Sequence, residues 1–248
     1  MPQRPPSVAT ESLKADFARL RQRVSGTVGV VLNAVGTHQI PVILGSAPAG
    51  PAWSTIKVPL AIAALRHAGT ATVTPNITAA ITESDNDAAE ALWASLGDPA
   101  VAARKVEDVL REAGDRTVVE SERVRPPFTA FGQTMWDVSE QVKFLSSAVC
   151  DQRNKPVFDL MGQIIDGQSW GLGRIADTRF KGGWGPSPAG NYLVRQIGVI
   201  ASAGGMTAVA VALEPSSGAF ADGVGDIDEV TRWLAEHISA LPKGVCGS

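Results

Sequence analysis

The pattern of hydrophobic and polar positions divides the chain into three stretches. Before residue 54 and after residue 167, short runs rich in β-branched and apolar residues predict strands. These strands are expected over 27–35, 40–44, 178–183, 192–201 and 206–213. Apolar residues at helical spacing predict an amphipathic helix towards each end, over 8–24 and 227–241. Both terminal helices are therefore expected to cover one antiparallel sheet.

The stretch between residues 54 and 167 has helical periodicity. Its helices are expected over 54–67, 76–82, 87–96, 99–113, 133–149 and 156–165. Pro99 suits the first turn of its helix, and Gly114 suits the position that ends it. The chain is therefore predicted to be a single α+β domain, in which a sheet lobe over 8–53 and 168–248 is interrupted by an all-helical lobe over 54–167.

The composition is that of an ordinary globular protein. With 248 residues, of which 44% are hydrophobic and 19% charged, the chain can bury a full core. A formal net charge of −3 with mixed signs gives no basic surface, so no nucleic-acid partner is expected. The longest apolar runs, 58–65 and 206–213, are shorter than the roughly 20 residues of a membrane helix. We expect a monomer without a transmembrane segment.

Two features bear on the cellular compartment. Residues 1–7 read as a polar tether that begins after a removed export signal. Cys150 and Cys246 are either bridged, which would anchor the C-terminal tail, or free thiols, and the sequence leaves both open. A bridge would form in an oxidising compartment. We expect an extracytoplasmic protein, in the cell envelope or secreted, with a membrane tether at its N-terminus as one option.

The clearest chemical signal is Ser54 followed by Lys57, at the point where a Gly/Pro-rich loop gives way to a predicted helix. The two side chains lie one turn apart on one helix face, so the amine can reach the hydroxyl. Unpaired N–H groups of the first turn favour a developing alkoxide and disfavour an ammonium. The pair therefore suits a nucleophile and its base. The alternative is a helix cap beside a solvated lysine.

Two later stretches complete a known arrangement. Residues 84–86 read Ser-Asp-Asn between two predicted helices, and residues 181–184 read Lys-Gly-Gly-Trp on a predicted strand. With Ser54 and Lys57, these stretches resemble the serine β-lactamase and penicillin-binding protein superfamily, most closely class A β-lactamases, whose motifs are Ser-x-x-Lys, Ser-Asp-Asn and Lys-Thr-Gly. Gly182 departs from that pattern, because the family usually has a threonine or serine there.

The resemblance implies a role for each matching residue. Ser54 would be the nucleophile, Lys57 its base, Ser84 a proton relay and Lys181 a second cation. The backbone N–H groups of Ser54 and Trp184 would form the oxyanion hole. Substrate-binding positions would be Asn86, Gly183, Trp184 and Arg195.

The role expected of Arg195 depends on the hairpin formed by the predicted strands 178–183 and 192–201. If the hairpin is symmetric about Pro188, Arg195 lies opposite Lys181 on the same face and could grip a substrate carboxylate. A register slipped by one residue would turn Arg195 to the other side, and an ordinary sheet-face arginine is the alternative.

The reaction implied is attack of Ser54 on a β-lactam or on a D-Ala-D-Ala-like peptidoglycan end, a small-molecule or peptide substrate, through an acyl-enzyme. The family's deacylating glutamate stands four residues before an asparagine, whereas Glu120 and Glu122 are followed at that distance by Val124 and Pro126. Release of the acyl group is therefore expected to be slow. The alternative is a cell-envelope binding protein with little or no turnover.

Other chemistries lack the residues that they require. His67 follows Ser54 by thirteen positions on one predicted helix, about 20 Å away, which is too far for a Ser-His-Asp triad. Three scattered histidines and two distant cysteines have no metal-ligand spacing. No metal and no cofactor is expected.

Overall fold

The computed structural model describes residues 8–37, 39–69 and 72–247, so the expected tether over 1–7 lies outside the described residues. Its centre is a five-stranded antiparallel sheet with the strand order β2-β1-β5-β4-β3. The strands are β1 (Gly26–Ala34), β2 (Val42–Gly45), β3 (Thr178–Pro186), β4 (Tyr192–Ser202) and β5 (Gly205–Pro215). All five expected strands are present, and the predicted α+β class is confirmed.

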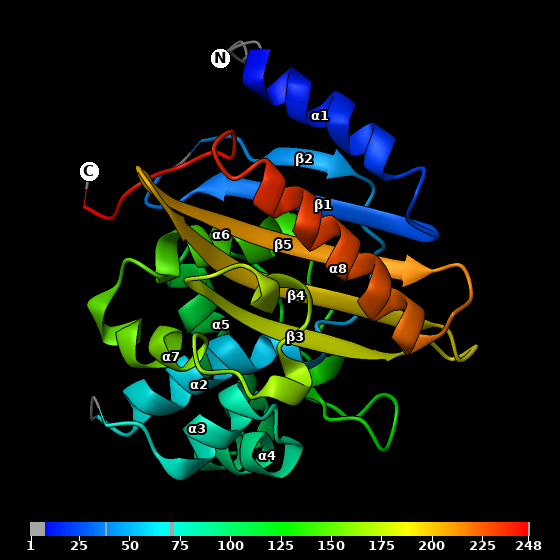
Figure 1. Ribbon diagram of the computed structural model, residues 1–248. Helices are drawn as coiled ribbons and strands as arrows, with labels where there is room; N and C mark the ends of the chain where they lie inside the picture. The colour runs from blue at the N-terminus through cyan, green and yellow to red at the C-terminus, as the bar shows by residue number, and fades with distance from the viewer. Residues whose placement is uncertain (1–7, 38, 70–71, 248) are drawn as a thin grey trace.

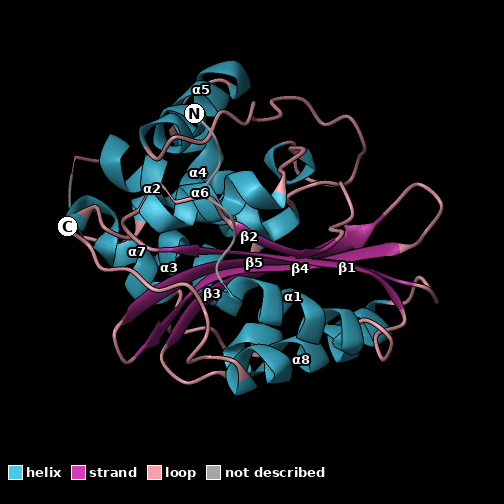
Figure 2. Ribbon diagram, turned by 90° about the horizontal axis from the view of Figure 1, so that it is seen from above, coloured by secondary structure: helices cyan, strands magenta, loops and turns pink. Residues whose placement is uncertain are grey.

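Helices cover both faces of the sheet, as Figure 2 shows from above. The terminal helices α1 (Val8–Leu20) and α8 (Phe220–Glu236) lie side by side on one face. The other helices lie on the opposite face, with α6 packed directly on the sheet (Figures 1 and 2). They are α2 (Lys57–His67), α3 (Pro75–Thr82), α4 (Asn86–Ser95), α5 (Pro99–Glu112), α6 (Val138–Ala148) and α7 (Lys155–Leu160).

The alternation of side chains along β5 explains why the core has two layers. Ala208, Ala210 and Ala212 belong to the hydrophobic cluster that also contains the helices of the middle stretch. Val209 and its alternate neighbours Val211 and Leu213 belong to the cluster that contains the terminal helices. Small alanines on the first face let α6 approach the sheet closely, and the large residues on the second face fill the space beneath α8.

Several helix boundaries differ from those expected. The helix α6 begins at Val138 rather than at 133, because the side chain of Asp137 caps it by accepting from Ser139 N. The helix α8 begins at Phe220 rather than at 227, α7 ends at Leu160 rather than at 165, and α1 ends at Leu20 rather than at 24. These differences concern the ends of the helices and not their presence.

The hairpin between β3 and β4 has a different register from the one expected. Gly183 pairs with Arg195, and Lys181 pairs with Ile197, so the hairpin is symmetric about Ala189 and not about Pro188. Gly190 supplies the reason, since it adopts φ +92 and closes the turn one position later. Lys181 and Arg195 still share a face of the sheet, because the shift amounts to two residues.

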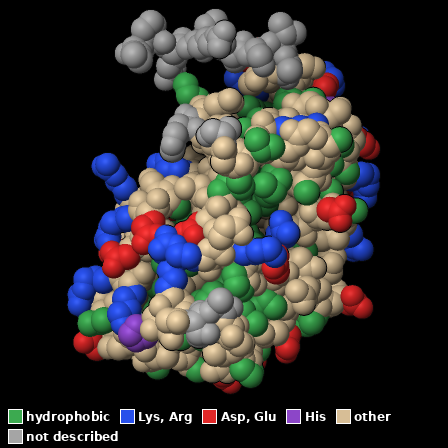
Figure 3. All heavy atoms as spheres, turned by 90° about the vertical axis from the view of Figure 1, so that its left-hand side faces the viewer, with side chains coloured by type: hydrophobic (Ala, Val, Ile, Leu, Met, Phe, Trp, Pro, Cys, Tyr) green, Lys and Arg blue, Asp and Glu red, His purple; other side chains and the backbone are tan. Residues whose placement is uncertain are grey.

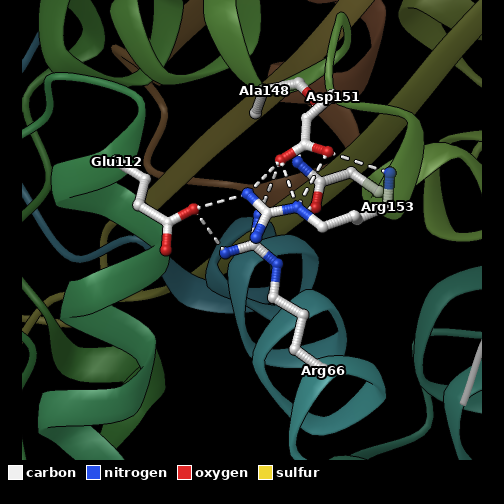
Figure 4. Close-up of polar contacts among 6 residues, drawn as sticks. Arg66, Glu112, Ala148, Asp151 and Arg153 are labelled. Carbon is white, nitrogen blue, oxygen red and sulfur yellow. Dashed lines mark hydrogen bonds and ion pairs between the residues drawn. The ribbon is translucent and has the colours of Figure 1, made fainter. Parts of the chain in front are cut away.

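Covalent and ionic contacts join the helices around the end of α6. A disulfide connects Cys150 to Cys246, so the bridged alternative is the one that the structure contains. Next to it, Arg66 of α2 donates to Glu112 at 2.8 Å and to Asp151 at 3.1 Å, and Arg153 contacts the same two carboxylates (Figure 4). Hydrogen bonds from Arg153 lower the pKa of Asp151. The network ties α2, α5 and the segment after α6 together.

The outer surface matches the mixed charge of the sequence. On the face shown in Figure 3, Lys and Arg side chains are interspersed with Asp and Glu. Within the described ranges, no helix has the length and apolar character needed to cross a membrane.

Candidate active site

Ser54 lies in a 3-10 turn, η1 (Trp53–Ile56), that leads directly into α2. Trp53 holds a left-handed φ of 51, which is costly for a residue other than glycine and is retained only where surrounding contacts impose it. Thr55 provides such contacts, because its Oγ1 donates to Ala52 O at 2.6 Å and accepts from Gln141 Nε2 at 3.1 Å. The turn that carries Ser54 is therefore fixed from both sides.

Lys57 extends from the first turn of α2 into a buried polar cluster. Its Nζ donates to Ser84 O at 2.6 Å and to Asn86 Oδ1 at 2.7 Å, with Ser84 Oγ at 3.4 Å. The residue is only 1% exposed. Burial lowers the pKa of Lys57 to about 8, although the nearby Asp85 carboxylate opposes the shift. A substantial fraction of the amine is therefore neutral near pH 7 to 8.

Ser84 lies between two lysine side chains. Its hydroxyl accepts from Lys181 Nζ at 2.7 Å and faces Lys57 Nζ, so it links β3 to the segment between α3 and α4. Lys181 also donates to Gly182 O at 3.0 Å and is fully buried. Burial, and then the neighbouring Lys57, lower the pKa of Lys181 well below its usual value. Both amines are thus disposed to exchange protons through one hydroxyl.

Asn86 opens the helix α4, two residues after Ser84. The capping side chain of Asp85 accepts from Ala88 N at 2.6 Å and fixes the start of this helix. Since Asn86 uses its Oδ1 for Lys57, its Nδ2 group is left for another acceptor.

Glycines let β3 and the nucleophile turn approach each other. A Cβ atom on Gly183 would lie 2.9 Å from Ala52 O, Ser54 N and Thr55 N, so any side chain there would push η1 away. A Cβ on Gly185 would lie 2.5 Å from the ring of Trp53. At Gly182 the space beside the backbone is filled by the ring of Trp170, which would lie 3.2 Å from a Cβ atom.

A cavity of about 530 Å³ opens over Ser54. It brings together Ser54, Lys57, Ser84, Asn86 and Trp184 from the sequence-predicted set. Lys181 and Gly183 lie directly behind this surface, in contact with Ser84 and with η1. Aromatic side chains form part of the wall, namely Trp53, Phe128, Trp184 and Tyr192.

Arg195 lies elsewhere, and the expectation that it grips a substrate carboxylate is corrected. The residue is 1% exposed, and its guanidinium donates to four acceptors. Nη1 donates to Gly50 O and Pro51 O, and Nη2 donates to Trp136 O and Gln141 Oε1, at 2.8 to 3.1 Å. Burial lowers the pKa of Arg195 to about 10, which still leaves it protonated at pH 7. Its contacts hold the loop that precedes Ser54.

The two glutamates considered for deacylation are held in a loop. Glu120 N donates to Thr134 Oγ1, and the Glu120 side chain accepts from Glu122 N. Among the described residues, the carboxylates that line the cavity are instead Asp87 and Glu90. Arg123 lines it too and donates to Glu90 Oε1 at 2.6 Å. These residues were missed, although Glu90 follows Asn86 by four positions and so shares its helix face.

The described part of the chain has no group of three or more His, Cys, Asp or Glu residues arranged to hold a metal ion.

Comparison with solved structures identifies the fold. No protein-family model matches the chain, and no curated protein sequence matches it. Solved structures do match, among them a class A β-lactamase from Bacteroides cellulosilyticus, with 15% identity, a TM-score of 0.74 and coverage of 95% of this chain and 100% of that one. A class A β-lactamase from Mycobacterium abscessus has 18% identity, a TM-score of 0.67 and coverage of 92% and 99%. An ancestral class A β-lactamase has 24% identity, a TM-score of 0.66 and coverage of 90% and 99%. The chain therefore has the fold of class A β-lactamases.

Proposed function

We propose that this protein is a serine acyl hydrolase or transferase of the β-lactamase and penicillin-binding type, in which Ser54 forms the acyl-enzyme. One observation carries the proposal. Lys57 shares the cavity of Ser54, is held by Ser84 and Asn86, and has a pKa lowered to about 8 by burial. A neutral amine in the same cavity as a serine hydroxyl can act as the base that activates it.

Each step of the proposed reaction is assigned to one group. Lys57 takes the proton of Ser54 Oγ as this oxygen attacks the acyl carbon, and the backbone N–H groups of Ser54 and Trp184 stabilise the developing oxyanion. The proton passes through the Ser84 hydroxyl, which faces both lysines, to the leaving nitrogen. Asn86 Nδ2 binds the amide group of the substrate. Lys181 donates to the Ser84 hydroxyl and so holds it in position for this relay.

The substrate class is a β-lactam or a D-Ala-D-Ala-like peptidoglycan end. The structural neighbours are named as β-lactamases, and the cavity has the size of an ordinary small-molecule site. In this proposal the cavity lies between a sheet lobe (8–53 and 168–248) and a helical lobe (54–167) of a monomer. The Cys150–Cys246 bridge supports an extracytoplasmic location, because disulfides persist in oxidising compartments.

Slow release of the acyl group is part of the proposal. Ester hydrolysis needs a positioned water and a base, and neither Glu120 nor Glu122 lines the cavity over Ser54. The adduct should therefore accumulate, with a burst of one product per enzyme before a slow steady rate.

A second function is supported by the surroundings of Gly182. Gly182 has no hydroxyl, and the Trp170 ring lies beside it. Lys181 is buried. Few groups are therefore left there to bind a substrate carboxylate. These features favour a cell-envelope binding protein with little or no turnover.

Labelling with a fluorescent penicillin and with activated esters separates the two functions. An acyl hydrolase should give a covalent band that is lost in Ser54→Ala, whose thermal unfolding should match that of the wild type. Saturable binding of peptidoglycan fragments without any covalent band would instead support the binding protein.

A further inference from the structure

Glu90 is the carboxylate best placed to act on an acyl group at Ser54. It lies on α4, four residues after Asn86, and residues at this spacing share one helix face. Asn86 Oδ1 is 2.7 Å from Lys57 Nζ, and Glu90 is one further turn along, about 6 Å by the helical rise. Glu90 and Ser54 line the same cavity. Glu90 and Ser54 therefore face the same solvent-filled space.

The other cavity carboxylate, Asp87, has a different environment. It lies roughly 100° around the helix from Asn86 and is exposed, whereas Glu90 is half-buried. The side chain of Glu90 is only 30% exposed and is held by the ion pair with Arg123. This difference makes Asp87 a matched control for the charge of Glu90.

Arg123 orients the Glu90 side chain. Its Nη2 donates to Glu90 Oε1 at 2.6 Å, and Arg123 comes from the loop between α5 and α6. One carboxylate oxygen is thus occupied, which leaves Oε2 to accept from a water. An ion pair with side chains 52% and 30% exposed contributes little to stability, so fastening the loop to α4 does not by itself account for it.

We propose that Glu90 is the general base that activates water for release of the acyl group, an inference that rests on the acyl-enzyme proposed at Ser54. Glu90 accepts a proton from water while the water oxygen bonds to the acyl carbon. The bond from that carbon to Ser54 Oγ then breaks. The proton held by Glu90 returns to Ser54 Oγ by way of Lys57, so the products are a free acid and the starting enzyme.

This assignment agrees with slow release. One oxygen of Glu90 is occupied by Arg123, so only the other oxygen is left to accept a proton from water. Deacylation is then finite but slower than acylation.

The test follows the acyl-enzyme by intact mass after a pulse of a penicillin or an activated ester. Glu90→Gln should form the adduct at the wild-type rate but keep it about 100-fold longer or more, the lower end of what a general base contributes. Asp87→Asn should leave the lifetime within about threefold of the wild type.

Arg123→Gln breaks the same ion pair but keeps the carboxylate. It should change thermal unfolding as Glu90→Gln does, and lengthen the adduct lifetime by less than about tenfold, because the base remains. An equal lengthening in both variants would assign the effect to the loop and overturn the role of Glu90. A Glu90→Gln adduct with the wild-type lifetime would also overturn the role of Glu90, but it would still support the acyl-enzyme at Ser54. If neither the wild type nor Glu90→Gln forms an adduct with any probe, both the acyl-enzyme at Ser54 and the role of Glu90 are refuted.

Discussion

Replacing Arg195 by methionine should destabilise the protein rather than impair binding of a substrate. The four acceptors that its guanidinium satisfies are buried in the loop before Ser54 and near α6. An acceptor left without a donor costs about 1 to 3 kcal/mol, and removing a buried charge returns part of that cost. A net loss of about 4 kcal/mol is therefore expected. For a chain of this length it corresponds to roughly 10 °C in the unfolding temperature.

Thermal unfolding followed by circular dichroism would measure this loss. Arg179→Met is the matched control, because Arg179 is on the neighbouring strand β3, is 39% exposed and lies 3.6 Å from Asp159. It should shift the unfolding temperature by no more than about 2 °C. Arg195→Lys keeps the charge but loses the planar fork, so it should recover less than half of the stability. An Arg195→Met protein that unfolds within about 2 °C of the wild type, but acylates much more slowly, would refute this reasoning.

Three further changes probe the site and its support. The acylation rate should rise with pH through about 8 and then level off, because Lys57 acts in its neutral form and burial lowers its pKa to about 8; a rate that is flat from pH 6 to 10 would contradict this. Replacing Cys150 and Cys246 by serine should cost about 4 to 5 kcal/mol, as expected for a loop of nearly 100 residues, and a non-reducing peptide map without the linked pair would argue against the bridge. Gly183→Val should slow acylation at least tenfold by displacing the Ser54 turn, whereas Gly225→Ala, with open space around it, should not.

The sequence predicted the sheet and most helices because their apolar positions repeat at the proper period. It misplaced the start of α8, since Gly223 and Gly225 lower the helix propensity of its first turns. Tertiary packing overrides that preference. A Cβ on Gly223 would lie 2.7 Å from Val194, so the small residue allows α8 to lie close to β4.

The candidate site residues that belong to local motifs can be identified from the sequence. Ser54, Lys57, Ser84 and Asn86 are recognisable from their spacing, and the structure brings them into one cavity. The position of Arg195 depends on a turn residue, Gly190, and on acceptors more than 50 positions away in the chain. No local pattern contains that information.

Glu90 escaped notice for a similar reason. It belongs to none of the three motifs, and its partner Arg123 lies 33 positions later. Only the fold shows that both side chains line the cavity over Ser54.

The central claim, that Ser54 carries the acyl group, is tested most directly by locating the adduct. The protein would be incubated with a penicillin or an activated ester, quenched in acid, digested and mapped by tandem mass spectrometry. We predict one added acyl group, on Ser54, which is absent in Ser54→Ala and forms about 10² to 10⁴ times more slowly in Lys57→Ala. An acyl group on any other residue, or a Ser54→Ala protein that is labelled as fast as the wild type, would contradict the account.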